Sequence, residues 1–564
     1  MIVSKTRNTI AKYSVDILYC LFLLAIAFKF TQSLETIKDI ELYDETFYLY
    51  QGIKIFELGI PKASWAPLYS MWYYFLSLFE QNNIALFYLN FKLLIFTSPS
   101  IFYIYLRTLK IRPLISIIFG FIYSISTISL LTPRLGSFLV LILLPFLIVA
   151  NFTKDNTKFY FLATLALLLI IFVRPEYTIS FLILFSLYMI LLIRSILLEK
   201  NNLKNAILQS SFLISLILLF FLVIGNPLAG RRSFMAFSQH FGFLWMERNN
   251  VVSPYLDYYK VVTQSIFGDA TNIFQVIIAN PREFLIHVRI NFISYIHHSI
   301  SILLVNLQND FSTVVNTTIR RFETILLLIV IIIPFWRSRI LLKQINYLVL
   351  KRLLIIFLSL FIPVFLSSLL INPRFHYLIL QSIFLLTIIA YFLENSFAPY
   401  WKNLRQKNRI YKLLSPILIG SFLLILTPNL ARGWCLTENF CIIQRISSPQ
   451  TLILPNLKTI EFIQSLQIED DVNILEADGG YNVYLGDRYH HVHEYQKQTN
   501  FKQFLDQEKI NMVVLTAALD NDVNFSQDEE FVEFVHRPEQ WNFTKLKIPE
   551  TEGFLLLASD LIEN

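Results

Sequence analysis

Long apolar runs separated by short polar connections recur along the chain from its first residues to about position 430. A helix of roughly 20 apolar residues spans the ~30 Å apolar core of a bilayer. About eleven runs approach that length with their flanks included. The predicted spans lie at 15–30, 84–106, 113–131, 135–150, 159–173, 177–193, 206–224, 322–336, 353–371, 377–393 and 413–430. The pattern predicts a polytopic α-helical membrane protein, with span ends less well defined than the spans themselves.

Beyond position 430 the pattern changes, because Asp, Glu, Gln and Asn become common and no further long apolar run follows. Short apolar segments predict buried strands at 472–475, 512–515 and 554–557. Helices are predicted between them at 458–466, 501–508 and 528–534. This alternation indicates a small α/β domain over 431–564, after a membrane domain over 1–430. About 130 residues suffice for a separate core.

Composition and charge agree with this division. Hydrophobic residues make up 55% of the chain, Phe alone occurs 52 times, and the mean hydropathy is +0.55, which excludes an ordinary soluble enzyme. Lys and Arg gather in alternate connections, at 107–112, 154–158, 194–204, 337–352 and 402–412. Cytoplasmic loops carry such an excess, so the N-terminus is predicted to be cytoplasmic and 431–564 extracytoplasmic. The net charge of +7 then reflects orientation and implies no nucleic-acid partner.

The first segment has a basic start and an apolar middle, as a cleaved signal peptide would. It lacks a small-residue cleavage site before Lys29, so we interpret it as an uncleaved anchor. The multi-pass protein is predicted to lie in a plasma membrane, with that of a bacterium preferred.

Two long segments, 31–83 and 225–321, are predicted to be outer loops. In the first, apolar residues recur at helical spacing after Asp44 and Glu45, which predicts an interfacial helix that Gly59 and Pro61 end. The apolar stretch 65–79 is too short to span. In the second, 284–307 is predicted to be an amphipathic outer helix, because a crossing there would reverse the charge bias of every later connection.

Three arginines stand in short outer turns, each beside a proline: Arg134, Arg174 and Arg374. A guanidinium presents a planar fork of donors that suits phosphate. The shared position therefore indicates an anionic ligand at the outer leaflet. The alternative is that each arginine snorkels to lipid headgroups or pairs with a neighbour such as Glu176.

The acidic pair Asp44 and Glu45 lies in the first outer loop, where a carboxylate could accept the proton of an attacking hydroxyl. The alternative is a solvated helix N-terminus, where acidic residues interact favourably with the helix dipole.

Several local patterns in order along the membrane region resemble the GT-C glycosyltransferases, which include protein mannosyltransferases and lipid A aminoarabinose transferases. Residues 43–48 (Tyr-Asp-Glu-Thr-Phe-Tyr) look like the acidic motif of that superfamily's first outer loop. Residues 65–69 resemble its aromatic and proline pattern before the second span, and 373–377 its late Arg and Tyr segment.

The resemblance implies transfer of a hexosyl or pentosyl group, normally with inversion, from a polyprenyl-phosphate-linked donor to a glycolipid, polysaccharide or protein acceptor. Asp44 would be the base and Glu45 its neighbour or an alternative base. The donor phosphate would be bound by Arg134, Arg374, Arg174 and His376. The acceptor or substrate loops would contribute Trp65, Tyr69, His287 and Arg289.

One departure from the superfamily concerns the turn 132–137, which carries the arginine but lacks the second acid that many members have there. Glu176, Glu247 or Asp269 could substitute, and the sequence does not choose among them. No cofactor is predicted, and the use of a divalent metal is left open.

The C-terminal domain has candidate chemistry of its own. Cys435 and Cys441 stand at its entrance on the predicted oxidising side, which favours a local disulfide. The cluster of His490, His491, His493 and Glu494 either supplies a metal site or is simply packed and solvated, and we favour the second. Gly479 and Gly480 follow a strand without the rest of a dinucleotide fingerprint, so they predict a turn.

Two other classes of function stay open. A transporter or flippase for a lipid-linked sugar would also need many spans and cationic groups, although no internal repeat is visible. A non-catalytic cell-envelope assembly protein would use the C-terminal domain to bind a glycan or protein.

Overall fold

A computed structural model describes residues 2–198, 203–229, 232–253, 258–303, 346–404, 409–427, 429, 433–437, 440–444, 454–477 and 479–561. Most of the chain before residue 427 forms a bundle of apolar helices. Among the described residues, six helices are long and apolar enough to cross a membrane. They are α1 (Ile2–Thr31), α5 (Asn83–Thr108), α9 (Thr178–Leu198), α10 (Leu203–Val223), α17 (Tyr347–Leu370) and α18 (Ile379–Leu404).

Shorter apolar helices complete this bundle. They are α6 (Pro113–Ile125), α7 (Leu135–Asn151), α8 (Asn156–Ile171) and α19 (Arg409–Leu426). The predicted span 322–336 lies outside the described residues. Large apolar side chains stay exposed on the bundle, such as Leu222 at 84% and Phe28 at 62%. An apolar surface of this kind fits a bilayer, and the helices are those of a multi-pass membrane protein.

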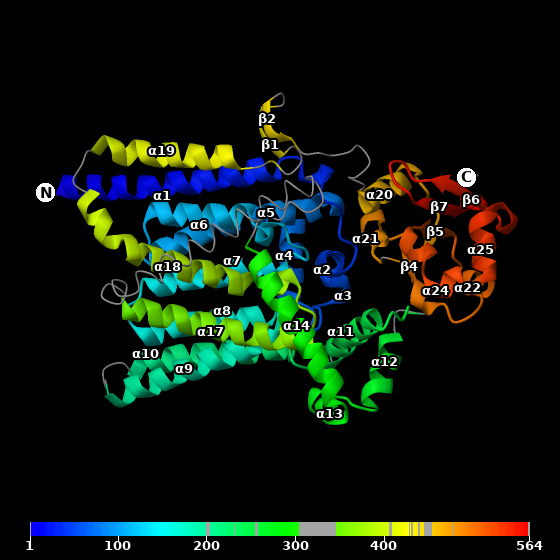
Figure 1. Cartoon of the computed structure of the whole chain (residues 1–564), viewed down its shortest axis with the longest axis horizontal. Coiled ribbons are helices and arrows are strands. Elements are labelled where there is room, and N and C mark those ends of the chain that lie inside the picture. Colours follow the sequence, from blue (N-terminus) through cyan, green and yellow to red (C-terminus); the bar gives the residue numbers. More distant parts are fainter. Residues whose placement is uncertain are drawn as a thin grey trace.

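Short helices gather at the end of the bundle opposite the N-terminus, close to the C-terminal domain (Figure 1). They are α2 (Asp44–Ile53), α3 (Ile55–Leu58), α4 (Pro67–Ser77), α11 (Arg232–Arg248), α12 (Tyr258–Phe267) and α13 (Ile273–Ala279). The sequence prediction of a helix starting at the acidic pair is confirmed. Gly59, at φ 79°, directly follows α3, so the helical segment ends at the glycine where the sequence predicted its end. Helix α14 (Pro281–Ser301) covers most of the predicted amphipathic segment and is not among the six candidate spans.

The C-terminal part is a five-stranded sheet with helices, in the strand order β4-β3-β5-β7-β6. The strands are β3 (Val472–Glu476), β4 (Tyr489–His493), β5 (Met512–Leu515), β6 (Phe543–Lys547) and β7 (Phe554–Ala558). The helices are α20 (Pro455–Ser465), α21 (Tyr481–Leu485), α22 (Phe501–Gln507), α23 (Ala517–Asp520), α24 (Val523–Ser526) and α25 (Glu529–His536). Strands β4, β3 and β5 run parallel, whereas β7 and β6 pair antiparallel.

The three predicted strands and three predicted helices of this domain are confirmed. The two edge strands, β4 and β6, do not stand out as apolar runs because polar and apolar residues mix along them. A separate antiparallel hairpin, β1 (Gly433–Thr437) and β2 (Phe440–Gln444), precedes the sheet.

The sheet domain docks on the loop that carries the acidic pair. The two carboxylate oxygens of Asp39 accept hydrogen bonds from the backbone N–H groups of Leu457 (2.9 Å) and Asn456 (3.0 Å) at the start of α20. The hydroxyl groups of Thr46 on α2 and Tyr484 on α21 are 2.7 Å apart. These contacts fix the position of the domain relative to α2.

Gly480 allows the closest approach at this interface. It has φ +123°, and a Cβ there would lie 2.7 Å from the carbonyl oxygen of Leu42 and 2.9 Å from Cγ2 of Thr46. Gly486, at φ +110°, has no atom within 4 Å of the same position. Both glycines avoid left-handed strain, but only Gly480 also avoids a clash between the two parts of the protein.

Substitution of these glycines tests the docking. Gly480→Ala should lower the free energy of unfolding by about 1–3 kcal/mol more than Gly486→Ala, because overpacking adds to the backbone strain that both share. Thermal unfolding of both variants measures the difference, and limited proteolysis shows whether the C-terminal domain loosens. Equal effects from the two substitutions would mean that the contact with Leu42 contributes nothing to docking.

Candidate functional site

Glu45 lies at the centre of a buried hydrogen-bond network that joins α2, α4, α5 and the turn before α7. One carboxylate oxygen, Oε1, accepts hydrogen bonds from the hydroxyls of Tyr69 and Tyr73 and from Nδ2 of Asn90 at 3.1 Å. The other, Oε2, accepts the backbone N–H of Arg134 at 2.5 Å. Glu45 is fully buried. Burial raises its pKa, and the hydrogen bonds from the tyrosines and Arg134 act in the opposite direction. Glu45 therefore holds this part of the protein together.

The Arg134 side chain belongs to the same buried region, with 1% of its surface exposed. Its Nη1 donates to the carbonyl oxygens of Ser129 at 2.8 Å and Leu131 at 3.1 Å. The guanidinium carbon lies 4.2 Å from the ring centroid of Phe91. Within the part of the chain that the structure describes, its Nε has no hydrogen-bond partner. In this conformation Arg134 stabilises its own turn.

Asp44, by contrast, is half-buried at the first turn of α2, and no described residue holds its carboxylate by a hydrogen bond or ion pair. A third carboxyl group, Glu41, lies nearby. Burial, followed by the charges of Glu45 and Asp44, raises the pKa of Glu41 to about 8. A carboxyl of this kind is neutral at pH 7, so it does not add a second negative charge beside Asp44.

The other two arginine turns lie together. Nε of Arg174 pairs with Oε1 of Glu176 at 2.8 Å, and its guanidinium carbon lies 4.2 Å from the ring centroid of Tyr377. Its Nη2 is buried without a hydrogen-bond partner among the described residues. His376 is buried beside it, and burial, followed by the charges of Arg174 and Arg374, holds the pKa of His376 well below its usual value. Arg374 itself is exposed. The two turns therefore offer one accessible cation, Arg374, and one mostly buried cation, Arg174.

Two contacts connect these turns to α2 and to the turn of Arg134. Gly136, in the first turn of α7, lies so close to the carbonyl oxygen of His376 that a Cβ would come within 2.8 Å of it. Tyr48, one helical turn after Asp44, interacts electrostatically with Arg174. The three arginine turns therefore converge beside the helix that carries Asp44, which the sequence could only suggest.

The predicted acceptor residues do not form one cluster as the arginine turns do. The ring centroids of Trp65 and Phe47 are 5.0 Å apart. The hydroxyl of Tyr69 donates a hydrogen bond to Glu45. His287 is buried, with its Nε2 2.9 Å from the carbonyl oxygen of Leu370, and burial lowers its pKa. Arg289 is exposed. Their role in acceptor binding stays a prediction.

The structure also describes the three acidic residues that could substitute for the second acid missing from the turn 132–137. Glu176 pairs with Arg174, whereas Glu247 and Asp269 are exposed. His240, on α11, has its pKa lowered to about 4 by burial and by the charges of Arg374 and His287. Helix α11 therefore lies beside the Arg374 turn.

The hairpin β1–β2 places Cys435 opposite Cys441 in its register. The side chains of both cysteines lie outside the described part of the chain, so the disulfide stays a prediction. Across the described residues, no group of three or more His, Cys, Asp or Glu side chains is arranged to hold a metal ion.

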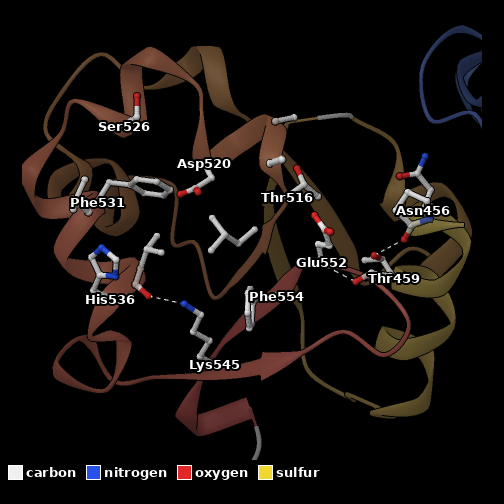
Figure 2. Close-up of a pocket in the computed structure, with 18 residues that line it drawn as sticks. Asn456, Thr459, Thr516, Asp520, Ser526, Phe531, His536, Lys545, Glu552 and Phe554 are labelled. Atoms are coloured by element: carbon white, nitrogen blue, oxygen red, sulfur yellow. Dashed lines mark hydrogen bonds between the residues drawn. The ribbon is translucent and has the colours of Figure 1, made fainter. Parts of the chain in front are cut away.

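Among the described residues, two of the cavities lie at the C-terminal domain. The larger, of about 820 Å³, lies within the domain beyond the end of β5, and Figure 2 shows Asp520, His536, Lys545 and Glu552 around it. Lys545 is held by a hydrogen bond from its Nζ to the carbonyl oxygen of Val535 at 2.9 Å. The smaller, of about 630 Å³, is a groove between α2 and the loops after β3 and β4. Only the smaller groove reaches the helix of Asp44.

Sequence reasoning did not find Tyr73, Asn90 or Glu41. Asn90 had a signal, because it is an amide within a predicted membrane span. Tyr73 follows Tyr69 by one helical turn on α4, a spacing that places both hydroxyls on one face. Glu41 lies only three residues before Asp44 and had no signal beyond its charge.

The chain matches no protein-family model and no curated protein sequence.

Proposed function

We propose that this protein is an integral-membrane glycosyltransferase of the GT-C kind, which moves a sugar from a polyprenyl-phosphate donor to an acceptor hydroxyl on the outer face of a plasma membrane. The proposal includes about eleven membrane crossings, a cytoplasmic N-terminus and an extracytoplasmic C-terminal domain. The observation that carries it is the convergence of three arginine turns beside helix α2, which begins at the half-buried Asp44.

Asp44 is the catalytic base in this proposal. The acceptor oxygen attacks the anomeric carbon as the bond from that carbon to the phosphate oxygen breaks, and Asp44 takes the proton of the acceptor hydroxyl. Asp44 is half-buried, and Glu41 near it is neutral at pH 7 and so does not act as a second base. Glu45, which is enclosed by four donors, is the positioning residue that fixes the start of α2.

The arginines bind the phosphate that leaves. Arg374 is accessible and makes the first contact, and Arg174 offers a buried N–H group behind it. Negative charge grows on the phosphate oxygen as the sugar bond breaks, and fixed donors at that place stabilise the transition state. The low pKa of His376 keeps its imidazole neutral between the two arginines, so it can bind phosphate only as a hydrogen-bond donor.

The donor site predicts a specific loss of lipid binding. Arg374→Ala should weaken the binding of polyprenyl phosphate about 10-fold or more, because a charge-assisted hydrogen bond contributes roughly 1.5–3 kcal/mol. Native mass spectrometry of the purified protein with polyprenyl phosphate measures the change. Arg282→Ala, which removes another exposed arginine at the start of α14, is the control and should bind as the wild type does. An equal loss in both variants would indicate nonspecific charge attraction and contradict the donor site.

A further inference from the structure

The groove between α2 and the sheet domain lies where α/β domains commonly bind ligands. It is bounded by the loops that follow β3 and β4, at the carboxyl ends of parallel strands. The chain passes from β3 to β4 on one side and then to β5 on the other, so the strand order reverses between β3 and β5. The groove lies on the β4 side of that reversal, outside the carboxyl ends of the strands, which is the end of open α/β sheets where ligands bind.

The two walls of the groove differ in character. The α2 wall presents the aromatic rings of Tyr43, Phe47 and Tyr50, spaced so that they follow one face of the helix. The domain wall presents Asn482, His490, His491, His493 and Glu494. No Lys or Arg occurs among the described residues that line the groove, so a phosphate group has no cation to bind there.

A chain of hydrogen bonds orders the polar wall. Oε1 of the buried Glu476 accepts the backbone N–H groups of Gly480 (3.0 Å) and Tyr481 (3.2 Å), and lies 2.9 Å from Nδ1 of His491. A carboxylate is an acceptor, so Nδ1 of His491 must donate. Nε2 of His491 in turn lies 2.6 Å from Nδ1 of His493, within hydrogen-bond distance. Hydrogen bonds within the wall therefore hold both rings in place.

Two groups of this wall have shifted pKa values. Burial and the neighbouring His491 lower the pKa of His493 to about 4, so its imidazole is neutral at pH 7. Burial raises the pKa of Glu494 to about 7. At pH 7, His493 is therefore uncharged and Glu494 is about half ionised.

We propose that this groove binds the acceptor as a glycan chain, with sugar C–H faces against the aromatic rings of α2 and sugar hydroxyls hydrogen-bonded to the polar wall. A sugar presents an apolar face and a rim of hydroxyls, which matches the two walls, whereas an anionic lipid or nucleic acid does not match a groove that no described lysine or arginine lines. The role as acceptor rests on the proposed function. Asp44 starts the same helix, so a glycan in the groove ends near the proposed base.

Binding can be measured without any transfer activity. The probe is a printed array of soluble oligosaccharides of two to six sugars together with control peptides, applied to the full-length protein in detergent. Tyr50→Ala and His493→Ala should each weaken the binding of the retained glycans at least 10-fold. His493→Gln, whose amide group still forms hydrogen bonds, should recover part of the loss. Asp520→Ala, in the separate cavity of Figure 2, is the matched control and should bind as the wild type does.

The outcomes separate the two proposals. Failure of the wild type to retain any glycan, selective retention of peptides, or equal losses in Asp520→Ala and the groove variants would overturn the glycan groove. Each of those results leaves the donor site intact if polyprenyl phosphate still binds in an Arg374-dependent way. Loss of donor binding with retained glycan binding would instead overturn the proposed transferase function. Thermal unfolding of each variant shows that losses do not come from misfolding.

Discussion

Replacing Asp44 by asparagine is expected to slow sugar transfer by about 10²–10⁴-fold, the range that a positioned general base contributes. Asparagine keeps the size and position of the side chain but cannot take the proton of the acceptor hydroxyl. The substitution should not disturb the fold, because no described residue holds the Asp44 carboxylate by a hydrogen bond or ion pair. The rate is measured as transfer of labelled sugar from polyprenyl-phosphate-linked donors to the acceptors identified by the array.

The control for this variant is Glu57→Gln, which neutralises an exposed acid on α3 whose side chain is 67% accessible. It should transfer sugar at the wild-type rate. Asp44→Asn should bind polyprenyl phosphate as tightly as the wild type, because the phosphate site is built from the arginine turns. A wild-type rate in Asp44→Asn would place the base elsewhere. A wild type that binds the lipid phosphate but transfers none of the candidate sugars would favour a lipid-linked sugar transporter or an assembly protein.

Local features of this protein could be predicted from its sequence. Helix α2 begins at Asp44 and its continuation ends before Gly59, and both signals lie within the segment itself. The central strands of the sheet are short apolar runs between polar turns, so β5 could be recognised without knowledge of its neighbours. The apolar segments of the bundle were also recognised, but helix length depends on where each segment is packed. Helix α6 ends at Ile125, whereas the apolar pattern continued to 131.

The site could be predicted only in part, because its contacts join residues far apart in the chain. The arginine turns were recognised from charge and proline, yet nothing local distinguishes the exposed Arg374 from the buried Arg134. The acidic pair was recognised as a unit, but α2 turns Glu45 inward and leaves Asp44 half-exposed. That division depends on tyrosines of α4 and an amide of α5, which the chain reaches 24 to 45 residues later.

Glu45→Ala should lower the free energy of unfolding by about 3–5 kcal/mol, the cost of breaking a buried charged network. The change leaves the hydroxyls of Tyr69 and Tyr73 and the N–H of Arg134 without their acceptor, in a region closed to water. Asn90 does not replace the carboxylate, since its Nδ2 can only donate and its Oδ1 already accepts a hydrogen bond from Nε1 of Trp72 at 2.8 Å. The effect is measured as a fall in the midpoint of thermal unfolding in detergent.

Two further variants identify the cause of that loss. Glu45→Gln keeps the volume and one acceptor oxygen but turns an N–H₂ group toward one of the donors, so its midpoint should lie between those of the wild type and Glu45→Ala. Glu57→Ala removes an exposed carboxylate and should change stability by less than about 1 kcal/mol. A Glu45→Ala protein as stable as Glu57→Ala would show that the network does not hold α2 in place. In that case Glu45 would again be a candidate for the base, because a carboxylate that contributes nothing to the fold has no structural reason to be buried beside Asp44.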